Sequence, residues 1–161
     1  MTWIAGTALM LLASLVQVTW APKLTVLGAF PNLVLVIVVA VAWTKGQRPS
    51  LTFACIGGLL LDLTSPGPLG PHALALLAGA YLTGFWVRNV DPAGWVQPVI
   101  ATAVSTAVYS AVLVGLDDLL NLPVPPPALA VELAVAAAAY NCLLVLPALL
   151  ASRPVKREAP A

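Results

Sequence analysis

The chain consists of six apolar stretches separated by short segments that carry proline, glycine or charged residues. Only 8% of its 161 residues are charged, 61% are hydrophobic, and the mean hydropathy is +1.00. A soluble domain carries about 25% charged residues, so this chain has too little polar surface to cover a globule in water. We expect an all-α, polytopic integral membrane protein, because an isolated strand cannot satisfy its backbone in lipid.

The apolar stretches predict six transmembrane helices, since a helix needs about 20 residues to cross the hydrocarbon layer. The transmembrane domain covers residues 1–152, and a short polar tail covers residues 153–161. The second to fourth stretches are short, which tilt, partial spanning or discontinuous helices would explain. We place the six spans at residues 3–21, 31–44, 50–63, 72–87, 93–118 and 128–150.

The basic residues predict the orientation, because cytoplasmic loops are enriched in lysine and arginine. Residues 1–21 contain no basic residue, so we expect a retained helix and not a cleaved signal peptide. If the N-terminus is cytoplasmic, only Lys23 lies outside, and residues 45–49 form a compact basic loop inside. We therefore expect both termini in the cytoplasm. The basic residues on that side are Lys45, Arg48, Arg88, Arg153, Lys156 and Arg157.

A carboxylate and the single histidine of the chain lie in the central segment GGLLLDLTSPGPLGPH, residues 57–72. Asp62 is near the end of the third apolar stretch, and His72 begins the fourth. A charge in so apolar a setting needs a partner. We expect Asp62 to cap the start of the next helix or to pair with His72. The alternative is a contact between Asp62 and a ligand, an ion or a partner protein.

Roles are also expected for several other polar and small residues. Glu132 lies early in the sixth span, where it either stabilises a helix N-terminus or makes an inward contact with another span or a partner. Asp117 and Asp118 close the fifth span and are expected to be solvated outside. Small residues four apart, as in Ala54 and Gly58, are expected to pack helices against one another.

The sequence contains no pattern typical of an enzyme. It has no nucleophile elbow, phosphate loop or dinucleotide fingerprint. A single histidine makes a poor metal site, and Cys55 and Cys142 lie in apolar runs where cysteine behaves as a small hydrophobe. A net charge of +1 does not favour nucleic-acid binding. We therefore expect no catalytic, cofactor-binding or metal-binding residues and no cofactor.

Four short motifs lie between residues 31 and 88, at residues 31–33, 45–48, 57–62 and 68–74. Together they resemble motifs of the bacterial rod shape-determining protein MreD family. Pro31-Asn32-Leu33 is similar to the family's P-[DN]-L helix start, and residues 45–48 are similar to its basic turn. Residues 57–62 are similar to its G-x-x-x-D segment, and residues 68–74 to its P-L-G-x-x-A-L segment. Gly79 and Tyr81 follow at a familiar spacing. The fifth and sixth spans match the family in hydropathy only.

The resemblance implies a non-enzymatic, multi-pass protein of the bacterial cytoplasmic (inner) membrane. Such a scaffold belongs to the cell-elongation (rod) complex, and it helps to maintain rod shape and lateral peptidoglycan synthesis. An MreC-type membrane protein is the expected partner, followed by MreB, RodA and a class B penicillin-binding protein, with membrane lipid around them. Gly57, Gly58, Asp62, Gly70 and His72 would form the structural motif. The expected partner or packing contacts are Gly79, Tyr81 and Glu132.

The family is also similar in fold to the substrate-binding S-components of energy-coupling-factor vitamin transporters. This likeness implies an alternative function, in which the chain binds a vitamin in a cavity near its outer face. The segment from Asp62 to His72 would lie at that face. A vitamin-binding pocket needs converging polar groups, and the sequence offers few beyond Asp62, His72, Tyr81 and Glu132.

Overall fold

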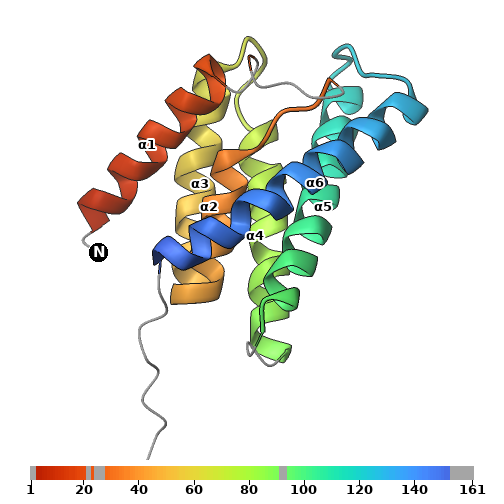
Figure 1. Ribbon diagram of the computed structural model, residues 1–161. Helices are drawn as coiled ribbons and strands as arrows, with labels where there is room; N and C mark the ends of the chain where they lie inside the picture. Colours follow the sequence, from red (N-terminus) through yellow and green to blue (C-terminus); the bar gives the residue numbers. More distant parts are fainter. Residues whose placement is uncertain (1–2, 21–22, 24–27, 91–93, 153–161) are drawn as a thin grey trace, which may run out of the picture.

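The computed structural model describes residues 3–20, 23, 28–90 and 94–152, and the described part is an all-α bundle (Figure 1). Each of the six apolar stretches coincides with one helix, and the ends differ by at most three residues. The polar tail predicted at residues 153–161 lies outside the described residues. The helices are α1 (Trp3–Thr19), α2 (Leu33–Lys45), α3 (Gln47–Thr64), α4 (Pro71–Asn89), α5 (Val96–Leu119) and α6 (Pro127–Ser152).

The shortest helix, α2, lies at the centre of the bundle. It packs against all five other helices, whereas α1 contacts only α2 and α3 among the described elements. More than half of the 13 residues of α2 are buried, and they belong to an uninterrupted run of valine, leucine, isoleucine and alanine. This position explains the run, because a helix surrounded by other helices is apolar on every side.

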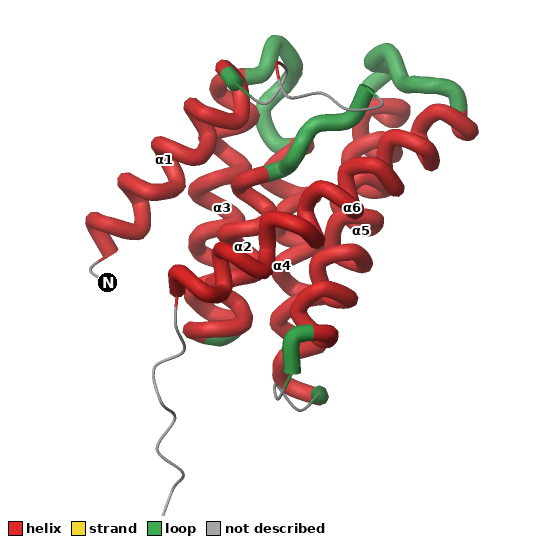
Figure 2. Tube along the Cα trace, in the orientation of Figure 1, coloured by secondary structure: helices red, strands yellow, loops and turns green. Residues whose placement is uncertain are grey.

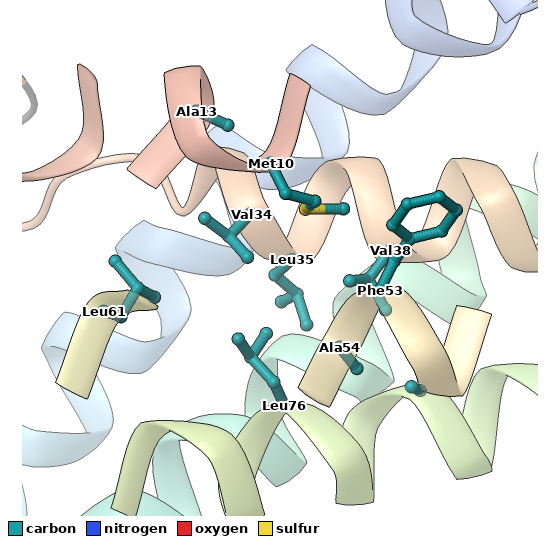
Figure 3. Packing of buried hydrophobic residues seen from close by; sticks show 10 residues of the cluster. Met10, Ala13, Val34, Leu35, Val38, Phe53, Ala54, Leu61 and Leu76 are labelled. Atoms are coloured by element: carbon teal, nitrogen blue, oxygen red, sulfur yellow. The ribbon is translucent and has the colours of Figure 1, made fainter. Parts of the chain in front are cut away.

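Two buried clusters hold the bundle together around α2. In the larger cluster, Met10 of α1 points toward Val34 of α2 and Phe53 of α3, while Leu76 reaches the cluster from α4 (Figure 3). The smaller cluster joins α2 to α6 through Val36, Val39, Ala40, Val145 and Leu149. The two clusters lie on different faces of α2, so each fixes a different set of neighbouring helices.

Two glycines of α3 allow close contact between helices. A Cβ atom on Gly58 would lie 2.3 Å from Cα of Ala73, so the backbones of α3 and α4 touch there. A Cβ atom on Gly57 would lie 2.5 Å from the Val34 side chain. Close packing through small residues, as predicted, is therefore confirmed at Gly57 and Gly58.

The compact basic loop predicted at residues 45–49 is wrong. Helix α2 ends at Lys45 and α3 begins at Gln47, so Gly46 alone separates them. Gly46 has a φ of 93°, and its N–H donates to the carbonyl of Ala42. Pro49 is tolerated in the first turn of α3, where an N–H needs no acceptor within the helix. Helix α3 consequently has 18 residues and is longer than predicted.

Two helices of the described chain are long and apolar enough to cross a membrane, α5 and residues 127–150 of α6. Helices α1 and α2 are apolar but shorter. Within an apolar stretch of 18 residues in each helix, only 22% is buried in the bundle for α5 and only 17% for α6. Both helices therefore present apolar side chains outward, unlike the core helices of a soluble protein. The membrane-spanning role predicted for the other four helices remains a prediction.

Three connections meet at one end of the bundle, which we call the loop end. Residues 28–32, 65–70 and 120–126 gather there, at the top of Figure 2. The opposite end, which we call the turn end, holds Gly46 and the connection between α4 and α5. Helices α2, α4 and α6 all begin at the loop end, so polar groups there face the N-termini of three helices.

Candidate functional site

The carboxylate of Asp62, in the last turn of α3, caps the first turn of α4. The backbone N–H groups of Gly70 and Ala73 donate to Oδ2 at 2.9 and 3.1 Å, and that of His72 donates to Oδ1 at 2.9 Å. The first N–H groups of a helix have no partner within the helix, so a neighbouring acceptor stabilises them. Asp62 is buried. The capping role predicted for Asp62 is confirmed.

The imidazole of His72 pairs with the same carboxylate. Its Nδ1 lies 3.0 Å from Oδ1 of Asp62, so the two predicted structural roles of Asp62 occur together. An ionised carboxylate can only accept, so Nδ1 is then the donor of this pair, and in a neutral ring Nε2 is left as an acceptor. About a quarter of the His72 side chain is exposed. Its ring centroid lies 6.5 Å from that of Tyr109 on α5.

The sequence between Asp62 and His72 explains why the chain turns here. Pro66, Gly67 and Pro68 cannot continue α3 as a regular helix, and α3 ends at Thr64. Gly70 has a φ of 124°, which residues with a side chain rarely adopt. Pro71 then occupies the first helical position of α4, where proline is favourable. The turn brings the first N–H groups of α4 onto the carboxylate.

A second helix start, that of α2, is capped by side-chain amides from three helical segments. The Asn32 side chain accepts from the N–H of Leu35 at 3.0 Å. Gln17 of α1 accepts from the N–H of Leu33 at 2.7 Å, and Asn141 of α6 accepts from the N–H of Asn32 at 2.8 Å. Asn32, Gln17 and Asn141 are all buried. These amides tie both α1 and α6 to the start of α2.

The Asn141 amide extends this network to α5. Its Nδ2 donates to the hydroxyl of Thr106 at 3.0 Å, and Thr106 donates in turn to the carbonyl of Thr102 at 2.8 Å. Buried polar groups are stabilising only when they are paired, and these pairs fix α2, α5 and α6 against one another.

A cavity of about 420 Å³ lies between the two capped helix starts at the loop end. One part of its lining is polar and comes from α1, α3, α4, α5, α6 and the residue that caps α2. The other part is apolar and comes mainly from α3, α5 and α6. The polar residues include Asn32, His72, Thr106, Tyr109, Ser110 and Asn141. The apolar residues include Leu61, Leu113, Val114, Leu133, Ala134 and Ala137.

The remaining predicted site residues lie apart from this cavity. Gly79 is buried in α4, where an added Cβ would lie 3.3 Å from Leu35, so it serves packing. Tyr81 is 61% exposed. Glu132 is exposed in the second turn of α6, so an inward contact with another helix of the described chain is wrong. Asp118 is exposed, and both Asp117 and Asp118 belong to the last turn of α5.

Sequence reasoning missed Gln17, Thr106, Tyr109 and Asn141. Gln17 and Asn141 are single amides in apolar helices, and that isolation is the signal that could have marked them. Their partners could not be inferred, because Asn141 bonds a residue 109 positions earlier in the chain. Thr106 and Tyr109 lie within the polar stretch of α5 and carry no comparable signal.

The arrangement is suited to binding and to holding helices together. The Asp62 carboxylate accepts four hydrogen bonds from Gly70 and the first turn of α4, so its oxygens are already engaged. Within the described residues, no three His, Cys, Asp or Glu side chains gather in a way that could hold a metal ion. The polar side chains that line the cavity carry amide, hydroxyl and imidazole groups.

Comparison with models of known protein families, with curated proteins and with solved structures finds no match for this chain. The likeness to MreD therefore depends on the short motifs of residues 31–88 alone. The structure assigns clear local roles to several of these residues. Asn32 and Asp62 cap helices, Gly58 allows a close helix contact, and Gly70 adopts a positive φ.

Proposed function

We propose that the chain is a six-span membrane protein of the bacterial cytoplasmic membrane. The outward-facing apolar side chains of α5 and α6 support this proposal, since water would not solvate them favourably. Residues with large exposed apolar side chains also occur on α1, α3 and α4, such as Leu12, Leu59 and Phe85. Helix α2 packs against all five other helices. Because it is surrounded by them, it does not need to be as long as the hydrocarbon layer is thick.

The proposed orientation has both termini in the cytoplasm and the loop end outside. Lys45, Arg48 and Arg88 belong to the turn end, which agrees with the enrichment of basic residues on the cytoplasmic side. Asp117, Asp118 and Glu132 belong to the half of the bundle nearer the loop end. The cavity between the capped helix starts would then lie near the outer surface.

We further propose that the chain acts as a non-enzymatic scaffold of the rod complex, with an MreC-type membrane protein as its main partner. The observation that carries this proposal is the place of the family-like motif residues at helix joints. Asn32, Asp62 and Gly70 shape the starts of α2 and α4, so the motif specifies a particular bundle. A scaffold needs such a fixed framework to present its outer faces.

The exposed Tyr81 is the residue of α4 that we propose for partner contact. It is 61% exposed, although the neighbouring Gly79 and Ala80 are buried against other helices. Aromatic side chains of this kind are frequent anchors of protein interfaces. Glu132, exposed on α6, is the second proposed contact.

Co-purification tests this scaffold function. The tagged full-length chain is extracted in mild detergent from a bacterium that carries its gene, and bound proteins are quantified by mass spectrometry. We expect strong enrichment of an MreC-type protein, and weaker enrichment with Tyr81→Ala than with the exposed-site control Phe85→Ala. Absence of MreC-type proteins from the wild-type sample would contradict the proposal.

The cavity favours a second candidate function, that of a vitamin-binding S-component. A volume of about 420 Å³ is within the range of small-molecule sites, about 300–1,000 Å³. This candidate requires a water-soluble vitamin to remain bound during purification. It also requires an energy-coupling module, and not an MreC-type protein, to co-purify with the chain.

A further inference from the structure

The cavity at the loop end combines features that define a class of ligand. It is lined by α1 and α6, which both pack against α2 but do not contact each other in the described chain. Gln17 and Val18 of α1 line one side, and Leu133 and Ala137 of α6 line another. A molecule can therefore occupy the space between them without separating two packed helices.

The lining contains no Lys, Arg, Asp or Glu among the described residues. The nearest carboxylate, Asp62, is buried behind His72 and is engaged by four hydrogen bonds. A charged ligand group placed here would lose its hydration without gaining an opposite charge, and such desolvation is strongly unfavourable. An anion would also face the negative charge of Asp62 across the His72 ring. The cavity thus favours an uncharged ligand.

The polar groups of the cavity favour a ligand that donates a hydrogen bond. Nδ1 of His72 is used by Asp62, and Nε2 has no hydrogen-bond partner within the described chain. In the neutral ring this nitrogen is an acceptor. The Asn32 and Asn141 side chains are already used in the caps. The hydroxyls of the lining, on Thr106, Tyr109 and Ser110, can donate as well as accept, whereas the free nitrogen of a neutral His72 ring can only accept. Leu113, Val114 and Leu133 offer an apolar surface to the rest of the ligand.

We propose that this cavity binds an uncharged amphipathic molecule whose hydroxyl or amide N–H donates to Nε2 of His72 and whose apolar part packs against α5 and α6. The inference rests on the cavity alone and on neither proposed function. Such a molecule comes either from the membrane, as a neutral lipid with a hydroxyl group, or from water, as a small aromatic alcohol or amide. The two sources share the same chemistry, and the experiment separates them.

The test uses the full-length chain in phosphatidylcholine nanodiscs, with empty nanodiscs as background. The main probe is 2-naphthalenemethanol, a neutral aromatic alcohol. Its carboxylate analogue, 2-naphthoate, adds a negative charge, and its methyl ether lacks the donor. Equilibrium dialysis measures binding. We expect saturable binding of the alcohol, at least tenfold weaker binding of the carboxylate, and at least fivefold weaker binding of the ether.

Two substitutions that fill the cavity locate the binding. Ala137→Trp and Leu133→Trp place a large ring in the cavity, whereas Leu143→Trp adds the same ring at a site that is 74% exposed on the same helix. We expect at least tenfold weaker binding of the alcohol to either cavity variant and unchanged binding to the control. Thermal unfolding of each variant verifies that it is folded.

Competition with 1-oleoylglycerol, a neutral lipid with free hydroxyls, identifies the source. Displacement of the alcohol supports a membrane-derived ligand, and saturable binding without displacement supports a water-borne one. Binding that does not saturate, equal binding of alcohol and carboxylate, or full binding to both cavity variants would overturn the proposal. None of these results bears on co-purification of an MreC-type protein, so the scaffold function is tested separately.

Discussion

Asp62 and His72 are joined twice, once through the backbone and once through the side chain. Oδ1 of Asp62 accepts the backbone N–H of His72 at 2.9 Å and lies 3.0 Å from Nδ1 of the ring. The end of α3 is thereby fixed to the start of α4 by a single carboxylate. Nδ1 is thereby engaged by Asp62, while the His72 residue lines the cavity.

Replacement of Asp62 should weaken the fold more than replacement of any other acidic residue in the described chain. Asp62→Ala leaves the N–H groups of Gly70, His72 and Ala73 without their acceptor. Loss of a cap and of buried hydrogen bonds predicts a decrease of about 2 kcal/mol or more in the free energy of unfolding. Denaturant titration in detergent micelles measures it. Asp118→Ala, at an exposed site, serves as the control, and equal stability of the two variants would contradict the role of Asp62.

His72→Ala should have a smaller effect than Asp62→Ala. The carboxylate keeps its three backbone donors when the ring is lost, and the His72 side chain is partly exposed. We expect a decrease of about 0.5–1.5 kcal/mol in the free energy of unfolding, the net contribution of one hydrogen bond. The same titration measures it. A decrease as large as that of Asp62→Ala would show that the ring, and not the helix cap, dominates the site.

The close contact between α3 and α4 at Gly58 predicts that an alanine substitution destabilises the protein at Gly58 but not at Gly115, a glycine of α5. A methyl group on Gly58 meets the backbone of Ala73, so Gly58→Ala should lower the free energy of unfolding by about 1–3 kcal/mol. Gly115 in α5 has nothing within 4 Å of the added Cβ. Gly115→Ala should therefore be neutral or stabilising by up to about 1 kcal/mol. Similar losses at both positions would rule out a specific close contact at Gly58.

The amide of Asn141 should be required for the packing of α6 against α2 and α5. Asn141→Leu removes the acceptor of the Asn32 N–H and the donor to Thr106, and we expect a loss of about 1–3 kcal/mol. Asn89→Leu replaces an exposed asparagine of α4 and should change stability by about 0.5 kcal/mol or less. Unfolding of the two variants in the same detergent tests the difference. A neutral Asn141→Leu variant would show that the network is dispensable.

The proposed orientation predicts which ends of the bundle are reached from outside the cell. In a variant with Cys55 and Cys142 replaced by alanine, single cysteines are introduced at exposed positions. Leu69→Cys and Val124→Cys, at the loop end, should react with a membrane-impermeant maleimide on intact spheroplasts. Arg48→Cys and Trp95→Cys, at the turn end, should react only after lysis. Labelling of both ends from outside would contradict a cytoplasmic turn end.

The positions of the helices could be predicted because hydropathy and proline mark them directly. The loop predicted at residues 45–49 was wrong because one glycine with positive φ suffices to reverse the chain, and Pro49 is compatible with a first helical turn. The cap formed by Asp62 could be anticipated because a buried carboxylate needs donors, and the next helix start offers them. Glu132 is exposed, so its carboxylate does not require donors from the protein and its surroundings could not be anticipated in the same way.

The network around Asn32 was beyond prediction for a different reason. Its partners come from α1, α5 and α6, and neither spacing nor periodicity relates Asn141 to Asn32 across 109 positions. The cavity follows from the same long-range arrangement, since its lining combines residues from five helices with Asn32, which caps α2. Local sequence patterns therefore specify the helix ends, whereas the site depends on how the helices meet.

Depletion of the chain in a rod-shaped bacterium that carries its gene tests the central proposal most directly. The measurement is cell width and length by microscopy over several generations after expression stops, with re-expression of the wild-type chain as the control. We predict that cells widen and lose their rod shape, and that re-expression restores it. Cells that keep their width and rod shape without the chain would contradict its assignment to the rod complex.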